Sequence, residues 1–382
     1  MPEDSFDVAV VGGGIVGLAH AWMARRRGLR VAVFERSRVA QGASVRNFGM
    51  IWPVGQPAGE LYDTALRARE LWRELGESNV VELEECGSLH LAHHDDELSV
   101  LEEFCELGTC PVSMLSAQET CQRSSLARPD GLLGALWSPT EMRVDPRTAS
   151  ARITAWLQQE QQVTCCFSTQ ISSVSDGLLT ASDGRSWKAD RIIICSNDDL
   201  VTLFPESLQT AGLVRCKLQM MRINCPRSRG SDCAPHVAGG LTLRHYAAFA
   251  ACSGLQRLKD RIAEETPELN EVGIHVMASL FPTGDVILGD SHVYGDDITP
   301  FSDEEIDRLI LRELKKIIRL PNWDISERWS GIYARHQDHA VVEHEVQPNV
   351  HLFVGTGGAG MTMAFGLADR AWQKWNRESI HV

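Results

Sequence analysis

Short apolar runs and a cluster of glycines alternate at the start of the chain. Residues 7–11 form an apolar, β-branched run that is typical of a buried strand. Glycines at 12–17 follow, and apolar residues recur at helical spacing over 15–27, after which Gly28 suits a helix end. A second apolar run covers 30–34. This order predicts a strand, a tight turn, a helix and a second strand, which together form a βαβ unit.

The middle of the chain alternates between helical and strand patterns. Between 213 and 290 strand patterns predominate, as in an antiparallel sheet. Residues Ser302 to Glu305 form a capping box, which predicts a helix that begins there and runs to about Ile318. The pattern also predicts helices at 60–77 and from Asp145 and Pro146 onward, and strands at 87–92 and 191–195.

The end of the chain repeats the order of strand, glycine turn and helix. Residues 350–354 predict a strand, 355–360 are rich in glycine, and 361–375 predict a helix. We expect this strand to return to the sheet of the first βαβ unit, so that the two glycine turns touch the two ends of one long cofactor. The alternative is that the second turn only packs the last helix.

Composition and charge are those of an ordinary globular protein. The chain has 382 residues, which suggests two domains or one large one, and 43% of them are hydrophobic. Its formal net charge is −14, so nucleic acids and anionic membranes are poor partners. No apolar run approaches the roughly 20 residues that span a bilayer. Residues 1–6 lack the basic and apolar pattern of a signal peptide.

Eleven cysteines are scattered along the chain without a CxxC pair. This spacing predicts neither a zinc site nor a disulfide framework, and we expect no bound metal. Free thiols are typical of a reducing compartment, so the sequence favours a cytoplasmic protein.

The first glycine turn fits the GxGxxG motif at Gly12, Gly14 and Gly17. These glycines permit a tight turn and let the backbone approach a pyrophosphate, and the helix N-terminus offers free N–H groups. Glu35 lies about 20 residues further on, where an acid accepts hydrogen bonds from an adenosine ribose. The motif predicts a dinucleotide. An NAD-dependent dehydrogenase is one alternative, but it has no need of the C-terminal glycine turn.

Together these segments resemble the D-amino-acid oxidase/glycine oxidase family of FAD-dependent amine oxidoreductases. The resemblance covers nearly the whole chain and rests on Val10–Gly17, Phe34–Arg36, Gly42–Ser44, Phe48–Met50, Cys86–Leu89, Val144–Pro146, Trp329–Gly331 and Gly355–Gly360. It implies an α/β fold in which a Rossmann-like FAD-binding domain is interleaved with an antiparallel-sheet substrate domain. The implied FAD-binding domain comprises 1–85, 143–212 and 326–382, and the implied substrate-binding domain comprises 86–142 and 213–325.

The resemblance also implies which residues hold FAD. The first glycine turn would meet the pyrophosphate, Glu35 the adenosine ribose, and the C-terminal turn the far side of the flavin. The implied cofactor-binding residues are Gly12, Gly13, Gly14, Ile15, Gly17, Glu35, Arg36, Ser44, Arg46, Asn47, Gly49, Met50, Gly358, Gly360, Met361 and Thr362. Asn197 stands where the family often has glycine, so cofactor contact there stays open.

Within the family, three segments are similar to a subgroup associated with aminophosphonate breakdown: 46–55, 217–222 and 289–292. Tyr333 and Gly358 also stand where glycine and D-amino-acid oxidases carry arginines that grip a substrate carboxylate. The candidate substrate-binding residues are Met50, Arg222, His245, Tyr246, Tyr333 and Arg335, with Arg244 and His336 in the same pool. The candidate positive charges beside the flavin, for oxygen reduction, are Lys217, His275 and His292.

The reaction that the resemblance implies is oxidation of the C–N bond of a small primary or secondary amine. Hydride would pass to flavin N5, water would hydrolyse the imine, and O2 would be the acceptor; no residue stands out as a catalytic acid or base. The expected substrate is an aminophosphonate of the 2-aminoethylphosphonate type, hydroxylated and N-methylated relatives included. Two alternatives stay open: a glycine, sarcosine or D-amino-acid oxidase or dehydrogenase, and a flavoprotein subunit without independent activity. Monomer and homo-oligomer also stay open.

Overall fold

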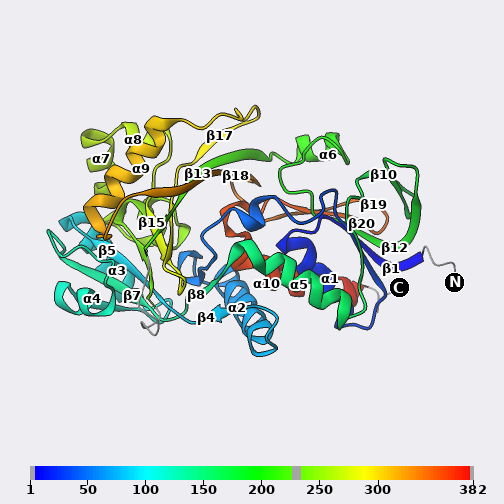
Figure 1. Ribbon diagram of the computed structural model, residues 1–382, viewed down its shortest axis with the longest axis horizontal. Helices are drawn as coiled ribbons and strands as arrows, with labels where there is room; N and C mark the ends of the chain where they lie inside the picture. Colours follow the sequence, from blue (N-terminus) through cyan, green and yellow to red (C-terminus); the bar gives the residue numbers. More distant parts are fainter. Residues whose placement is uncertain (1–4, 226–233, 379–382) are drawn as a thin grey trace.

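The computed structural model describes residues 5–225 and 234–378, and its first sheet has eight strands (Figure 1). They are β1 (Ser5–Val11), β2 (Val31–Phe34), β9 (Thr164–Cys166), β10 (Ile171–Ser175), β11 (Leu178–Ala181), β12 (Ser186–Ile194), β19 (Val342–Gln347) and β20 (Val350–Val354). The order is β10-β11-β12-β1-β2-β9, with β20 beside β12 and β19 beside β20. Residues 1–4 lie outside the described residues, and they are most of the segment 1–6 that lacks the pattern of a signal peptide.

Parallel pairing at the centre of this sheet confirms the predicted βαβ unit. β1 pairs in parallel with β2 on one side and with β12 on the other. β20 adds in parallel to β12, with Ile193 opposite His351. The C-terminal strand therefore does return to the sheet of the first strand, as the repeated order of strand, glycine turn and helix predicts.

Helices α1 (Ile15–Arg25), α2 (Glu60–Glu77), α5 (Pro146–Gln159) and α10 (Gly360–Glu378) share one apolar core with this sheet (Figure 1). Trp72 of α2 donates its indole N–H to the Met361 carbonyl at 2.9 Å. Its ring also meets Phe365 of α10 edge-on, with 4.8 Å between ring centroids. Burying one large apolar side chain contributes about 1.5–3 kcal/mol, so this contact holds the start of α10 in place.

The second sheet has nine strands and is mostly antiparallel. Its strands are β5 (Ser88–Ala92), β6 (Ser113–Ser116), β7 (Gly134–Ser138), β13 (Val214–Asn224), β14 (His236–Ala238), β15 (Met277–Leu280), β16 (Asp285–Gly289), β17 (Val293–Gly295) and β18 (Ile325–Arg335). The order is β17-β13-β16-β15-β14-β5-β7-β6, with β18 also beside β13. The predicted antiparallel sheet is confirmed, although β14 and β5 run parallel.

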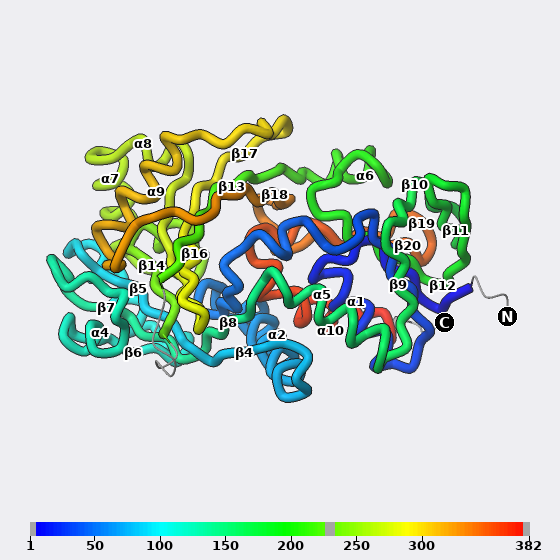
Figure 2. Tube along the Cα trace, in the orientation of Figure 1, coloured from blue at the N-terminus to red at the C-terminus, as the bar shows by residue number. Residues whose placement is uncertain are grey.

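A small third sheet lies where the chain crosses between these two parts. It consists of β3 (Met50–Ile51), β4 (Leu83–Glu84) and β8 (Met142–Val144). The remaining helices are α3 (Asp95–Glu106), α4 (Ala117–Arg123), α6 (Pro205–Thr210), α7 (Leu255–Glu265), α8 (Glu268–Glu271) and α9 (Glu304–Ile317). All of these except α6 lie beside the second sheet, away from the first one (Figure 2). None of the helices within 5–225 and 234–378 is long and apolar enough to cross a membrane.

The structure corrects two local predictions. Asp303, not Ser302, caps α9, because its carboxylate accepts a hydrogen bond from Glu305 N at 2.8 Å and a negative charge is favoured at a helix N-terminus. The first helix ends at Arg25, two residues earlier than expected. β18 pairs with β13 along most of its length and therefore belongs to the second sheet.

Candidate functional site

A cavity of about 680 Å³ is lined by residues of both large sheets. Gly12, which follows β1, and Gly358, which precedes α10, lie on its first-sheet side. Met220 of β13, Met277 of β15 and Tyr333 of β18 lie on its second-sheet side. Ligands of open α/β sheets bind outside the carboxyl ends of the parallel strands, which is where this cavity begins.

At two of the three motif positions of the first glycine turn, the neighbouring atoms leave no room for a side chain. Gly12 has φ +111°, and a Cβ there would overlap the carbonyl oxygen of Cys195. A Cβ on Gly17 would overlap the carbonyl oxygen of Gly12. Gly14 differs, because a Cβ there would approach only the Ser44 side chain, at 3.0 Å from its Oγ. Gly14 is also the N-cap of α1 and has no side chain of its own to cap the helix, whose N-terminus lies at the cavity.

Glu35 lies beside this turn at the end of β2. Its Oε2 accepts a hydrogen bond from Gly13 N at 2.8 Å, and its Oε1 accepts one from Ser37 N at 2.9 Å. Glu35 lines the cavity, whereas Gly13 does not. The carboxylate is therefore fixed at one end of the cavity, in the place where an adenosine ribose would need an acceptor.

The C-terminal glycine turn lines the same cavity. It contains a short 3-10 helix, Gly357–Ala359, between β20 and α10. A Cβ on Gly360 would lie 4.0 Å from Ile15 Cγ2, so the two glycine turns are neighbours. The alternative that the second turn only packs the last helix is wrong, because Gly358, Gly360, Met361 and Thr362 all line the cavity.

These features fit FAD. One continuous cavity runs past the N-terminus of α1, which suits a pyrophosphate, and past a fixed carboxylate, which suits a ribose. It also reaches the second glycine turn, where a backbone without side chains leaves room for a flat ring system. A nicotinamide dinucleotide would not account for the second turn.

Most of the other implied cofactor residues also line this cavity. Ser44 Oγ accepts a hydrogen bond from Ile15 N at 2.9 Å, which places its hydroxyl at the start of α1. The remaining lining residues of this group are Arg36, Arg46, Asn47 and Met50. Asn197, whose cofactor contact the resemblance leaves open, also lines the cavity. Gly49 does not line the cavity, because it packs against the Val144 carbonyl and Pro146.

The second-sheet side of the cavity carries five of the six candidate substrate residues: Met50, His245, Tyr246, Tyr333 and Arg335. Tyr333 is 5% exposed, and burial raises the pKa of its hydroxyl well above the usual value. Arg335 is exposed and donates a hydrogen bond to Tyr294 Oη at 2.8 Å. A Cβ on Gly358 would lie 3.5 Å from Tyr333 Oη, so Gly358 and Tyr333 are adjacent.

Three predicted cations do not line the cavity. Arg222 forms ion pairs with Asp285 at 3.2 Å and Glu327 at 3.7 Å. Lys217 donates to the carbonyl oxygens of Thr299 and Phe301.

Arg244, the third, points instead at backbone. It donates to the carbonyl oxygens of Leu241 and Ile274, at 3.2 Å and 2.8 Å. These partners hold all three side chains in structural roles.

Sequence reasoning missed Asp290 and Tyr294, which also line the cavity. Asp290 Oδ1 lies 2.8 Å from His275 Nε2, and Tyr294 holds Arg335. The signal was present in part, since the segment 289–292 belongs to the subgroup resemblance. Which side of the sheet these residues face follows only from the strand register.

Comparisons with known proteins identify the family. The chain matches the family model described as DAO, FAD dependent oxidoreductase, over residues 7–372. Glycine oxidase of Geobacillus kaustophilus (strain HTA426) is 27% identical over 210 residues, which are 50% of this chain and 54% of that protein. A subunit of the opine oxidase of Rhizobium meliloti is 27% identical over 148 residues, 34% of this chain and 39% of that protein. The matched segments span about half the length of these relatives or less.

The crystal structure of glycine oxidase from Geobacillus kaustophilus shares the fold. Its TM-score is 0.74 at 18% identity, over 97% of this chain and 94% of that chain. The predicted fold class is therefore confirmed. Because the family model spans nearly the whole chain and the cavity fits FAD, this chain belongs to the DAO family of FAD-dependent oxidoreductases.

Proposed function

We propose that this chain oxidises the C–N bond of a small amine that carries a phosphonate group, with FAD as cofactor and O2 as electron acceptor. The observation that carries the proposal is the adjacency of Tyr333 and Gly358. Neither of these two positions supplies the guanidinium with which glycine and D-amino-acid oxidases hold a carboxylate. The cavity side that faces them instead offers hydroxyl, guanidinium and imidazole groups.

The shape of the anion decides between a carboxylate and a phosphonate. One planar guanidinium fork suits a flat carboxylate, whereas a tetrahedral phosphonate accepts hydrogen bonds from several directions and carries up to two charges. Tyr333 and Arg335 are two residues apart on β18, so their side chains point to the same face of the sheet. Arg335 has no carboxylate within ion-pair distance in the described part of the chain, which leaves its charge for a ligand.

FAD, when bound, supplies the acceptor for the two electrons of this oxidation. Gly14 and the N-terminus of α1 would hold its pyrophosphate, Glu35 its ribose, and the turn at 357–360 would lie against its ring system. Thr362 Oγ1 accepts a hydrogen bond from Trp52 N at 2.9 Å, which fixes the cavity wall between the turn and the substrate side.

The substrate side of the cavity also favours a neutral amine. Met50, Leu218, Met220 and Met277 line it with apolar side chains. An apolar environment disfavours an ammonium ion, so it lowers the pKa of a bound amine. A neutral amine has the lone pair that oxidation of its C–N bond requires.

The two large sheets support the proposed division into an FAD-binding and a substrate-binding domain, with β18 assigned to the latter. Nine cysteines within the described ranges, from Cys105 to Cys252, have free thiols. We therefore also propose a reducing, cytoplasmic location.

Two relatives define the alternatives. Glycine oxidase suggests an independent enzyme that acts on an amino acid, and the opine oxidase relative suggests one member of a larger assembly. Anaerobic titration of the FAD-loaded protein separates them, because a substrate bleaches the flavin absorption without any partner. We expect 2-aminoethylphosphonate to bleach it. Bleaching by glycine or sarcosine alone would favour an amino acid oxidase, and no bleaching by any amine would favour a member of an assembly.

A further inference from the structure

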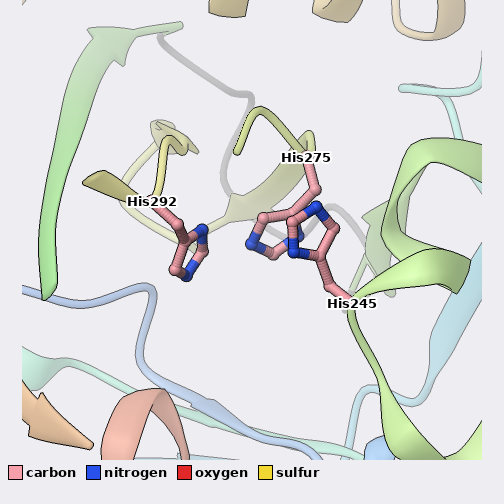
Figure 3. A group of neighbouring side chains, drawn as sticks. All are labelled: His245, His275 and His292. Carbon is pink, nitrogen blue, oxygen red and sulfur yellow. The ribbon is translucent and has the colours of Figure 1, made fainter. Parts of the chain in front are cut away.

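Three histidines converge on the substrate side of the cavity from three separate segments. His245 follows the 3-10 helix Gly240–Arg244, His275 precedes β15, and His292 lies between β16 and β17. The His245 and His275 rings stack with 4.5 Å between centroids, and His292 lies 4.7 Å from His275 in the same measure. Figure 3 shows His292 facing the stacked pair. We call these three residues the histidine cluster.

The hydrogen-bonding of the histidine cluster is incomplete. His275 is 5% exposed, and its Nδ1 has no hydrogen-bond partner in the described part of the chain. The Nδ1 of His292 is buried as well. A buried ring nitrogen without a partner loses its hydration and gains nothing in return, so an unfilled acceptor here points to a ligand.

We propose that the histidine cluster binds one divalent transition-metal ion of the zinc class, with an open coordination position toward the cavity. One ring nitrogen from each histidine lies within 4.8 Å of the other two. Tetrahedral zinc with Zn–N bonds of about 2.0–2.1 Å needs nitrogens about 3.3 Å apart, so the rings would have to move closer together to bind it. Three histidines and one free position are the ligand set of catalytic, not structural, zinc sites.

Asp290 completes the arrangement from behind. Its Oδ1 lies 2.8 Å from His275 Nε2, so His275 Nδ1 is the nitrogen that is left for a metal. The two residues are also joined by backbone hydrogen bonds in both directions, at 2.8 Å and 3.2 Å. A carboxylate behind a histidine ligand fixes the ring and makes the ligand more basic.

The neutral imidazole nitrogen is the commonest protein ligand of such metal ions. The proposed site departs from the expectation of no bound metal, and it consists of residues that no spacing motif links.

The open coordination position gives the metal ion a role in binding the substrate. This role rests on the proposed function. His292 lies next to Tyr333 and Tyr294, at 6.3 Å and 6.2 Å between ring centroids. A metal ion held there would face the same space as Arg335 and could accept one oxygen of an anionic substrate. It would supply the positive charge that the missing family arginines do not.

Metal binding is tested on the FAD-loaded protein without substrate. The protein is stripped with a chelator, equilibrated with Zn²⁺ by dialysis, and its metal content is measured by mass spectrometry. We expect one equivalent of Zn²⁺ per chain, with His275→Ala and His292→Gln each weakening binding by about 100-fold or more and Asp290→Asn by about 10- to 100-fold. His344→Ala, which changes an exposed histidine of β19, should bind Zn²⁺ as the wild type does.

Co²⁺ provides a second readout, since tetrahedral Co²⁺ ligated by histidines absorbs at longer wavelength than the flavin. Such a band, lost in His292→Gln, would support the site even where another variant fails to fold. Substoichiometric Zn²⁺, or binding unchanged in the cluster variants, would overturn it.

Activity then tests the role separately. A chelator-treated enzyme whose KM for 2-aminoethylphosphonate rises at least about tenfold and recovers with Zn²⁺ supports substrate contact. Stoichiometric Zn²⁺ in an enzyme that oxidises no aminophosphonate would leave the metal site intact and overturn the proposed function. Aminophosphonate oxidation without Zn²⁺ binding would overturn the metal site and leave the proposed function intact.

Discussion

A Cβ built on Gly358 would lie 3.5 Å from the Tyr333 hydroxyl. One residue comes from the turn before α10 and the other from β18, yet together they form one wall of the cavity. The local chemistry of that wall therefore depends on Tyr333 and on Arg335 beside it.

Substitutions on this wall should show how much the Tyr333 hydroxyl and the Arg335 guanidinium each contribute to substrate binding. Tyr333→Phe and Arg335→Ala should each raise KM for 2-aminoethylphosphonate by about 10- to 100-fold, because each removes a hydrogen bond to a charged group worth about 1.5–3 kcal/mol. The effect of Arg335→Ala should lie near the lower end, since this side chain is exposed. Arg222→Ala is the control, because Arg222 does not line the cavity. Equal effects of the control and the wall variants would contradict this assignment.

Gly14→Val should abolish FAD retention while the protein still folds. A side chain there meets only Ser44 in the protein, so the loss would come from the space that the pyrophosphate needs. Gly295→Val is a matched control, since a Cβ at this position would approach only the Asp297 carbonyl, at 3.8 Å. Flavin content after gel filtration and the far-UV circular dichroism spectrum are the measurements. A fully yellow Gly14→Val protein would show that the turn does not hold the cofactor.

Glu35→Ala should weaken FAD binding by about 10- to 100-fold, since it removes a charged acceptor for the ribose and frees Gly13 N. Fluorescence titration of the apoprotein with FAD gives the dissociation constant. Glu343→Ala, on β19 of the same sheet, should leave it unchanged. If Glu35→Ala binds FAD as tightly as the wild type, another residue is the ribose acceptor.

His90 should make the protein acid-sensitive. Burial lowers its pKa from the usual 6.5 to about 3, and neither ring nitrogen has a hydrogen-bond partner among the described residues. Between these two values the unfolded chain binds a proton that the folded chain does not. The free energy of unfolding therefore falls, as pH drops through this window, by up to about 1.4 kcal/mol per pH unit.

His90→Leu removes this pH-dependent contribution to the free energy of unfolding and keeps the site apolar. The loss of Tm between pH 7 and pH 5 should be smaller in the variant than in the wild type. The comparison uses the difference between the two proteins, because other buried histidines titrate in both. Parallel Tm curves would show that His90 contributes nothing to acid sensitivity.

The βαβ unit was predictable because its signals are local. The glycines at 12 and 17 leave no room for a side chain, and the strands beside them are continuous apolar runs. The N-cap of α9 was not predictable, since Ser302 and Asp303 both suit that position and only their backbone geometry decides between them.

The substrate side was less predictable for a different reason. Lys217 and Arg222 lie on β13, and only the pairing of that strand with β16, β17 and β18 decides which side chains reach the cavity. The histidine cluster likewise forms because β15 and β16 pair and bring His275 beside Asp290. The spacing of residues along the chain does not predict such contacts.

The measurement that tests the central claim most directly compares substrates that differ only in their anion. It is kcat/KM of the FAD-loaded enzyme for 2-aminoethylphosphonate against β-alanine, and for aminomethylphosphonate against glycine, with O2 uptake as the readout. We predict that the phosphonate exceeds its carboxylate partner by at least about tenfold in the preferred pair, which corresponds to about 1.4 kcal/mol of transition-state binding. A carboxylate that is turned over as efficiently as its phosphonate partner, or more so, in both pairs would contradict the account.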